Sequence, residues 1–173
     1  MATNIGTGPQ DIPLNQFLGE MAFADKIPKR PAFSVHNSGS DFTLVNDTKI
    51  TCFTTTDYNY FGGYNTSNQR FTAPESGLYL FGGHIRIGAP GKIRVARITL
   101  YVDGSYYTDL ASVGGTADYD GAGGYDHPPA SGTQLIYLNA GQYVELYVGE
   151  LSVSTTTYIQ NGRRAGWFGI LMF

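Results

Sequence analysis

Arg163-Arg164-Ala165-Gly166-Trp167-Phe168-Gly169-Ile170-Leu171-Met172-Phe173 is the stretch of sequence from which the fold can be argued. Successive side chains of a strand point to opposite faces, and here both faces are apolar. One face carries Trp167, Leu171 and Phe173, which can pack on the chain's own core. The other face carries Phe168, Ile170 and Met172, and it needs a second cover. The strand is either central in its own sandwich or covered by a second copy of the chain, and the near absence of predicted helix favours the copy.

Composition indicates an all-β protein with an aromatic surface that carries little charge. The 173 residues are 42% hydrophobic, which is enough for one sandwich-sized domain with a real core. The 23 glycines, 13 tyrosines and 10 phenylalanines suit short strands and tight turns. The net charge is −3, and the densest basic cluster is the pair Arg163 and Arg164, so we expect no nucleic-acid partner.

The same inspection disfavours several other classes of protein. Cys52 is the single cysteine, so the sequence has neither a disulfide framework nor a cysteine cluster for zinc. No run approaches the ~18 apolar residues of a membrane span. The first residues lack the basic and apolar regions of a secretion signal. We therefore expect neither membrane insertion nor secretion.

From Pro31 onward the sequence predicts antiparallel strands joined by turns. Residues 98–102 alternate, and Asp103-Gly104 predicts a hairpin with residues 106–110 as the return strand. Residues 143–148 alternate as well, and we expect them to pair with residues 135–138 across the turn Asn139-Ala140-Gly141. Residues 78–87 form a further strand, in which Gly82-Gly83 predicts a bulge or a close backbone approach. Strands at this spacing predict an antiparallel sandwich or jelly roll.

Residues 1–30 have a different pattern and form a predicted arm ahead of a domain at residues 31–173. Its apolar residues fall at helical spacing, and Asp11 is placed to cap a short helix. So short a helix is not stable alone, so the arm must dock either on its own domain or, as we favour, on another protein. The candidate anchoring residues are Ile12, Leu14, Phe17, Leu18, Met21 and Phe23.

Four blocks in order resemble the globular complement C1q domain: residues 31–35, residues 53–58 with 65–81, residues 131–144 and residues 167–171. The resemblance implies the ten-stranded antiparallel jelly roll shared with tumour necrosis factor, assembled as a homotrimer. It also implies that Phe33, Phe71, Gly77, Tyr79, Phe81, Gly141, Phe168 and Gly169 form the structural framework. We assign to the trimer interface or core Tyr79, Phe81, Tyr143, Trp167, Phe168, Ile170 and Met172.

Residues 5–23 resemble a segment that begins virion structural proteins of tailed bacteriophages, especially marine cyanophages. The resemblance implies a protein made in the host cytoplasm and displayed on the virion surface. A trimeric knob would be anchored to other virion proteins through three arms, and avidity would strengthen the attachment. Head decoration, head fibre and tail fibre all remain open. The alternative is a freestanding soluble module that binds a glycan or a protein.

Catalysis has little support in the sequence, and we expect no enzyme. His36, His84 and His127 are scattered, and no nucleophile elbow or zinc-binding histidine pair occurs. The Gly-rich loop at 114–130 is either a solvated variable loop or a recognition site. Its Asp118, Asp120 and Asp126 are weak calcium candidates, because their spacing is not that of an EF-hand, and we otherwise expect no cofactor. Its Tyr119, Tyr125 and His127 could contact a host cell-surface glycan or protein.

Overall fold

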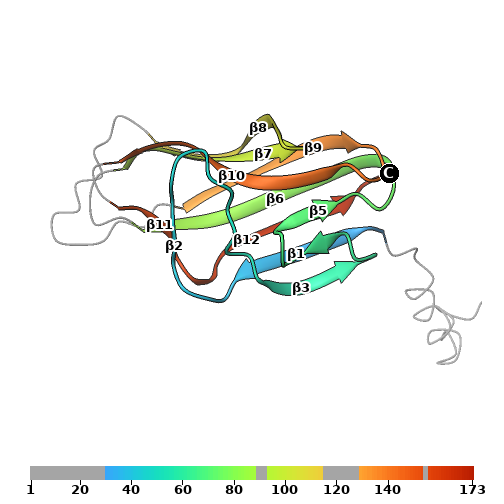
Figure 1. The fold of residues 1–173 in the computed structure, drawn as a ribbon, viewed down its shortest axis with the longest axis horizontal. Helices are drawn as coiled ribbons and strands as arrows, with labels where there is room; N and C mark the ends of the chain where they lie inside the picture. The colour runs from blue at the N-terminus through green and yellow to red at the C-terminus, as the bar shows by residue number, and fades with distance from the viewer. Residues whose placement is uncertain (1–29, 89–92, 115–128, 154–155) are drawn as a thin grey trace, which may run out of the picture.

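The computed structural model describes residues 30–88, 93–114, 129–153 and 156–173. These residues form two antiparallel sheets and no helix, which confirms the predicted all-β sandwich (Figure 1). The strands are β1 (Ala32–Asn37), β2 (Phe42–Thr43), β3 (Thr55–Tyr60), β4 (Tyr64–Asn65), β5 (Arg70–Thr72), β6 (Gly77–Gly88), β7 (Ile93–Val102), β8 (Ser105–Gly114), β9 (Pro129–Leu138), β10 (Tyr143–Val153), β11 (Tyr158–Ile159) and β12 (Gly162–Leu171).

The seven-stranded sheet has the order β2-β11-β6-β12-β1-β3, and β9 also pairs with β6. The five-stranded sheet has the order β4-β5-β10-β7-β8. The strands β3, β1, β12, β6 and β9 on one side and β4, β5, β10, β7 and β8 on the other are the ten strands of a jelly roll. The two-residue strands β2 and β11 extend the first sheet, since β11 pairs with β6 at Ile87 and Gly88, beyond the residues that β12 covers.

Aromatic rings fill the space between the two sheets. Phe33 is fully buried at their centre, with the rings of Tyr64, Phe71 and Trp167 at centroid distances of 4.9, 4.9 and 4.6 Å. Each ring brings a large apolar area, and tilted or offset ring pairs add to it. Strand alternation points every second side chain into this space, and aromatic and aliphatic residues together make the core continuous across both sheets.

The predicted hairpin between β7 and β8 is confirmed. Val102 pairs with Ser105, and both turn residues have positive φ, 50° at Asp103 and 77° at Gly104. Two positive φ values define the turn type that matches the right-handed twist of the flanking strands. The Asp103 carboxylate also accepts hydrogen bonds from the Gln142 side chain at 2.7 Å and from the Tyr143 N–H at 3.0 Å.

The predicted pairing of residues 135–138 with residues 143–148 is wrong. Leu138 pairs with Gly77 in the seven-stranded sheet, whereas Val144 pairs with Phe71 and Val102 in the five-stranded sheet. The turn between them crosses from one sheet to the other. The backbone of this turn forms hydrogen bonds with Ala73 and does not join β9 to β10 in a hairpin. The Gly141 N–H donates to the Ala73 carbonyl, and the Ala73 N–H donates to the Gln142 carbonyl, each at 2.8 Å.

The pair Gly82-Gly83 marks a close approach and not a bulge, because β6 keeps its register with β12 and β9 through both residues. The domain begins and finishes at one end of the sandwich (Figure 1). There the Leu171 N–H donates to the Pro31 carbonyl at 2.8 Å, beside the register pair Ala32 and Ile170. The predicted arm helix and its anchoring residues lie outside the described residues.

Candidate functional site

Strand β12 has two faces that differ in burial. Trp167 and Leu171 point into the core and are 2% and 7% exposed, whereas Phe168, Ile170 and Met172 are half-buried on the outer face of the sheet. Phe173 was predicted to share the core face, and that prediction is wrong: its side chain is 79% exposed. The reason is that β12 ends at Leu171, so Phe173 lies beyond the sandwich that buries its neighbours.

The register of the seven-stranded sheet places further apolar side chains beside those of β12. Ile170 lies next to Leu80 on β6, and Leu80 lies next to Leu135 on β9. One step along, Leu78 lies next to Tyr137. Leu135 is 53% exposed and Tyr137 62% exposed. We name this surface the apolar face, and its members are Leu78, Leu80, Leu135, Tyr137, Phe168, Ile170 and Met172.

Gly82 lets the Phe168 ring lie flat across β6. A Cβ atom at position 82 would stand 2.5 Å from the Phe168 ring and 2.9 Å from the Thr133 methyl group. Real Cβ atoms do not approach other atoms so closely, so any other residue would push the ring away from the sheet. The sequence motif of two glycines therefore shapes the apolar face.

The remaining predicted interface or core residues, Tyr79, Phe81 and Tyr143, lie in two places. Tyr79 and Phe81 are fully buried between the sheets and belong to the core. Tyr143 is half-buried on the outer face of the five-stranded sheet, so it lies on the opposite side of the sandwich from the apolar face. Tyr58 and Tyr60 were not predicted as site residues from the sequence, and strand β3 places them at the rim of the apolar face with their rings stacked at 5.5 Å.

A polar group lies on the same sheet, at the end of β1 away from Ile170. The Asp57 carboxylate accepts hydrogen bonds from the Ser34 hydroxyl at 3.1 Å and the His36 ring at 3.3 Å, and it pairs with Arg163 at 3.1 Å. The His84 ring nitrogen lies 3.1 Å from the Arg163 carbonyl oxygen. A surface hollow of about 360 Å³ opens between these residues.

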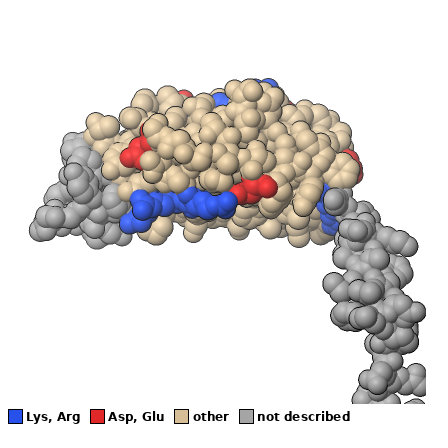
Figure 2. Space-filling view, turned by 90° about the horizontal axis from the view of Figure 1, so that it is seen from below, with Lys and Arg blue, Asp and Glu red and all other residues tan. Residues whose placement is uncertain are grey.

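Opposing effects set the pKa of Asp57. Desolvation raises it, but the hydrogen bonds from His36 and Ser34 and the charge of Arg163 outweigh desolvation and lower the pKa below its ordinary 3.8. The Ser34 hydroxyl bonds the carboxylate and not the imidazole, so these residues do not form the nucleophile and base pair of a hydrolase. Figure 2 shows the molecule from below: most of the visible surface is uncharged, and one row of Lys and Arg side chains ends beside an acidic side chain.

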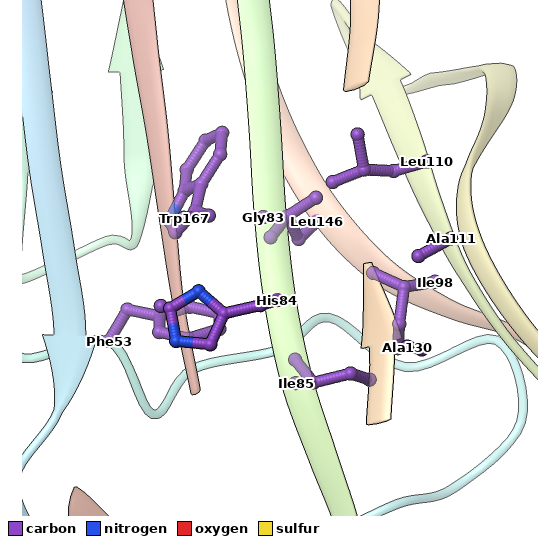
Figure 3. A pocket seen from close by; sticks show the side chains of 11 residues that line it. Phe53, Gly83, His84, Ile85, Ile98, Leu110, Ala111, Ala130, Leu146 and Trp167 are labelled. Atoms are coloured by element: carbon purple, nitrogen blue, oxygen red, sulfur yellow. The ribbon is translucent and has the colours of Figure 1, made fainter. Parts of the chain in front are cut away.

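Figure 3 shows a cavity between the two sheets that is too small for a ligand. Its volume is about 10 Å³, and side chains such as Phe53, Ile98, Leu146 and Trp167 line it. A single water molecule needs about this much space and several polar partners. The cavity is therefore a small packing defect of the core.

Other predicted site residues lie outside the described part of the chain: Asp118, Asp120, Asp126, Tyr119, Tyr125 and His127, together with the anchoring residues of the arm. Within the described ranges, no group of three or more His, Cys, Asp or Glu residues could hold a metal ion. The same ranges contain no helix that is long and apolar enough to cross a membrane.

These two sheets and their strand order define a C1q/TNF-like jelly-roll domain. One similar structure is the globular domain of zebrafish complement 1qA protein, with a TM-score of 0.55 and 16% identity, covering 84% of this chain and 98% of that chain. Another is the Eiger TNF of S. frugiperda, with a TM-score of 0.61 and 11% identity, covering 83% of this chain and 94% of that chain. At these identities the likeness concerns the fold. No protein-family model matches the sequence, and comparison with curated proteins gave no match.

Proposed function

We propose that this chain is a structural module that assembles as a homotrimer through its apolar face. The observation that carries the proposal is the run of apolar side chains across β6, β9 and β12, on the sheet face that turns away from the core. A contiguous apolar patch of this kind is unusual on a monomeric protein and marks an interaction surface. C1q- and TNF-like domains typically form homotrimers, which favours three copies over two.

The neighbouring polar group suits the rim of such an interface. The apolar face supplies the desolvated centre, and the Asp57 group, with the ion pair to Arg163 at 3.1 Å, lies farther along the same sheet. Protein interfaces commonly combine an apolar centre with a polar rim that stays hydrated. The ion pair at the rim would contribute to orientation more than to affinity.

Light scattering on substituted chains tests the assembly. The full chain should have three times the chain mass of 18.8 kDa. Leu135→Asp should give monomers or aggregates, because it places a charge in the apolar centre at a position that is already 53% exposed and that the monomer fold can tolerate. Phe168→Asp should do the same. Tyr106→Asp is the matched control, since Tyr106 is an exposed aromatic residue on β8 of the other sheet.

A trimer that persists in both the Leu135 and the Phe168 variants would contradict the proposal. A trimer lost in the Tyr106 control as well would show that the face is not specific. Far-ultraviolet circular dichroism on the same samples separates loss of assembly from loss of fold.

We further propose that the trimer is a knob displayed on a bacteriophage virion, on the head or on a tail fibre, and attached to other virion proteins through residues 1–30. The support for this step is the sequence of residues 5–23, which resembles the start of phage virion proteins, and the apolar pattern that needs a docking partner. Three arms on one trimer would multiply weak individual contacts. The second candidate is a freestanding binding module, because the likeness in fold concerns the domain and not the arm.

Removal of the arm distinguishes the two candidates. The full chain and a fragment that starts at Pro31 are each mixed with purified particles stripped of this protein. Virion anchoring predicts that both chains are trimers and that only the full chain rebinds. Failure of the full chain to rebind, or loss of the trimer on removal of the arm, favours the freestanding module.

A further inference from the structure

Tyrosine rings cover the outer face of the five-stranded sheet. Tyr101 on β7 and Tyr147 on β10 are stacked at a centroid distance of 4.1 Å, and Tyr106 on β8 meets Tyr101 edge-on at 6.2 Å. The Arg70 guanidinium lies 3.6 Å from the centre of the Tyr143 ring. Strands β8, β7 and β10 are neighbours in the sheet (Figure 1). The ring contacts across them therefore form one surface. We name Tyr101, Tyr106, Tyr143 and Tyr147 the tyrosine face.

A buried carboxylate organises the charged groups of this surface. Glu145 points outward between Tyr143 and Tyr147, yet it is only 3% exposed. Its Oε1 accepts hydrogen bonds from the Lys49 ammonium at 2.5 Å and from the Arg70 guanidinium at 3.0 Å. One carboxylate thus holds two cationic side chains in place, and both keep part of their surface in water, with side-chain exposures of 21% and 33%. Groups that are fixed before a ligand arrives lose less entropy when it binds.

The Tyr147 hydroxyl remains neutral in this setting. Burial raises the pKa of Tyr147 above its ordinary 10, the charges of Glu145, Tyr101 and Tyr143 add to the increase, and the Arg70 charge opposes it. The hydroxyl therefore stays available as both donor and acceptor.

The two outer faces of the sandwich differ in kind. The apolar face presents leucine, isoleucine, methionine and phenylalanine, which suit the desolvated centre of a protein interface. The tyrosine face instead has the partly exposed cationic groups of Arg70 and Lys49 beside its rings, both held by the buried Glu145. Its aromatic surface therefore carries hydrogen-bonding groups, namely the tyrosine hydroxyls and these two cationic side chains. That combination matches a ligand whose own surface alternates C–H groups and hydroxyl groups.

We propose that the tyrosine face binds a glycan. Ring surfaces would contact the C–H faces of pyranose rings, while the tyrosine hydroxyls and the cationic groups held by Glu145 would bond sugar hydroxyls. Tyrosine supplies a large amphipathic contact area at a low entropy cost. The inference rests on the proposed function, because an assembly through the apolar face leaves the five-stranded sheet outward.

The test uses the full chain on immobilised neutral, amino-sugar and acidic oligosaccharides. We expect binding to at least one class and a loss of affinity of about tenfold or more in Tyr101→Ala/Tyr147→Ala, the magnitude at which an interface residue counts as important. Tyr101→Phe/Tyr147→Phe keeps the rings and their packing, and it should bind more weakly than the parent. Tyr107→Ala is the matched control: Tyr107 is 51% exposed on β8 and takes no part in the ring pairs above.

Binding to envelopes of marine cyanobacteria provides a second assay. Periodate, which cleaves vicinal diols, should abolish it. Loss after protease treatment alone would assign a protein ligand and overturn the inference, as would the absence of binding to every oligosaccharide or equal binding by all variants. Light scattering on the same samples keeps the two proposals apart. A trimer without glycan binding refutes this inference alone, and glycan binding by a monomer refutes the proposed assembly alone.

Discussion

Substitution of Gly132 by alanine should open one edge of the sandwich. Gly132 on β9 lies where the edges of the two sheets meet, and a Cβ atom there would stand 1.8 Å from the Leu110 carbonyl oxygen and 2.9 Å from its carbon. Carbon and oxygen atoms in contact stay about 3.3 Å apart, so the β8 backbone would have to retreat by about 1.5 Å. A carbonyl in a strand cannot rotate away as a flexible side chain can.

The magnitude follows from what that retreat disturbs. Leu110, Ala111 and Ala130 are buried at this edge, and the Gln134 side chain donates to the Asp109 carbonyl at 3.3 Å across it. Overpacking of a core costs about 1–3 kcal/mol, and partial exposure of these side chains adds to it. We expect a loss of ~3 kcal/mol in the free energy of unfolding, equivalent to a fall of about 6–12 °C in the melting temperature of a domain of this size.

Denaturant unfolding at one fixed protomer concentration measures this loss, because the stability of an oligomer depends on concentration. Gly39→Ala is the control. Gly39 lies in the loop after β1, where the nearest atom to an added Cβ would be the Asn37 side-chain oxygen at 3.7 Å, so its effect should stay within about 0.5 kcal/mol. If the Gly132 variant unfolds within about 1 kcal/mol of the Gly39 variant, the reasoning is wrong.

Two further predictions concern titrating groups. Folding lowers the pKa of Asp57 below 3.8, so the stability that this carboxylate contributes is present above that pH and is lost as the pH falls through the folded pKa. Asp57→Asn should therefore lose less stability in acid than the parent chain does. Equal pH profiles of the two chains in thermal melts would contradict this. Burial raises the pKa of the Cys52 thiol to about 12. A disulfide reagent at pH ~8 should therefore modify Cys52 in the denatured chain at once, and in the native chain only as fast as the chain unfolds. Rapid modification of the native chain would refute the prediction.

Much of the fold could be predicted from local sequence patterns. The hairpin of β7 and β8 could be predicted from the alternation of residues 98–102 and the turn Asp103-Gly104, because a hairpin depends only on residues that are close in sequence. The pairing of residues 135–138 with residues 143–148 failed for the opposite reason. A short turn leads either to a hairpin or to a crossing between sheets, and contacts with the distant Ala73 and Gly77 decide between them.

The candidate site was predictable in part. Alternation in residues 167–172 places Phe168, Ile170 and Met172 on one face, but Leu80 and Leu135 join them only through the strand register. The tyrosine face was not predicted from the sequence, because the charged group beside its rings combines residues that are distant in sequence. Glu145 accepts hydrogen bonds from Lys49 and Arg70, which are 96 and 75 residues away in sequence. An outward glutamate within an alternating strand looks like a solvated residue until those partners are known.

The position of β1 has a mechanical consequence for the attachment that we propose. Its six residues pair with β12 on one side, five of them pair with β3 on the other, and Pro31 precedes the strand in the sequence. Antiparallel ladder bonds run perpendicular to the strands, so a pull along β1 strains both ladders in shear and all their bonds together. A tether at this point would resist drag better than one on an edge strand, whose single ladder can be peeled bond by bond. A force applied through residues 1–30 would thus have to break the hydrogen bonds of two ladders together.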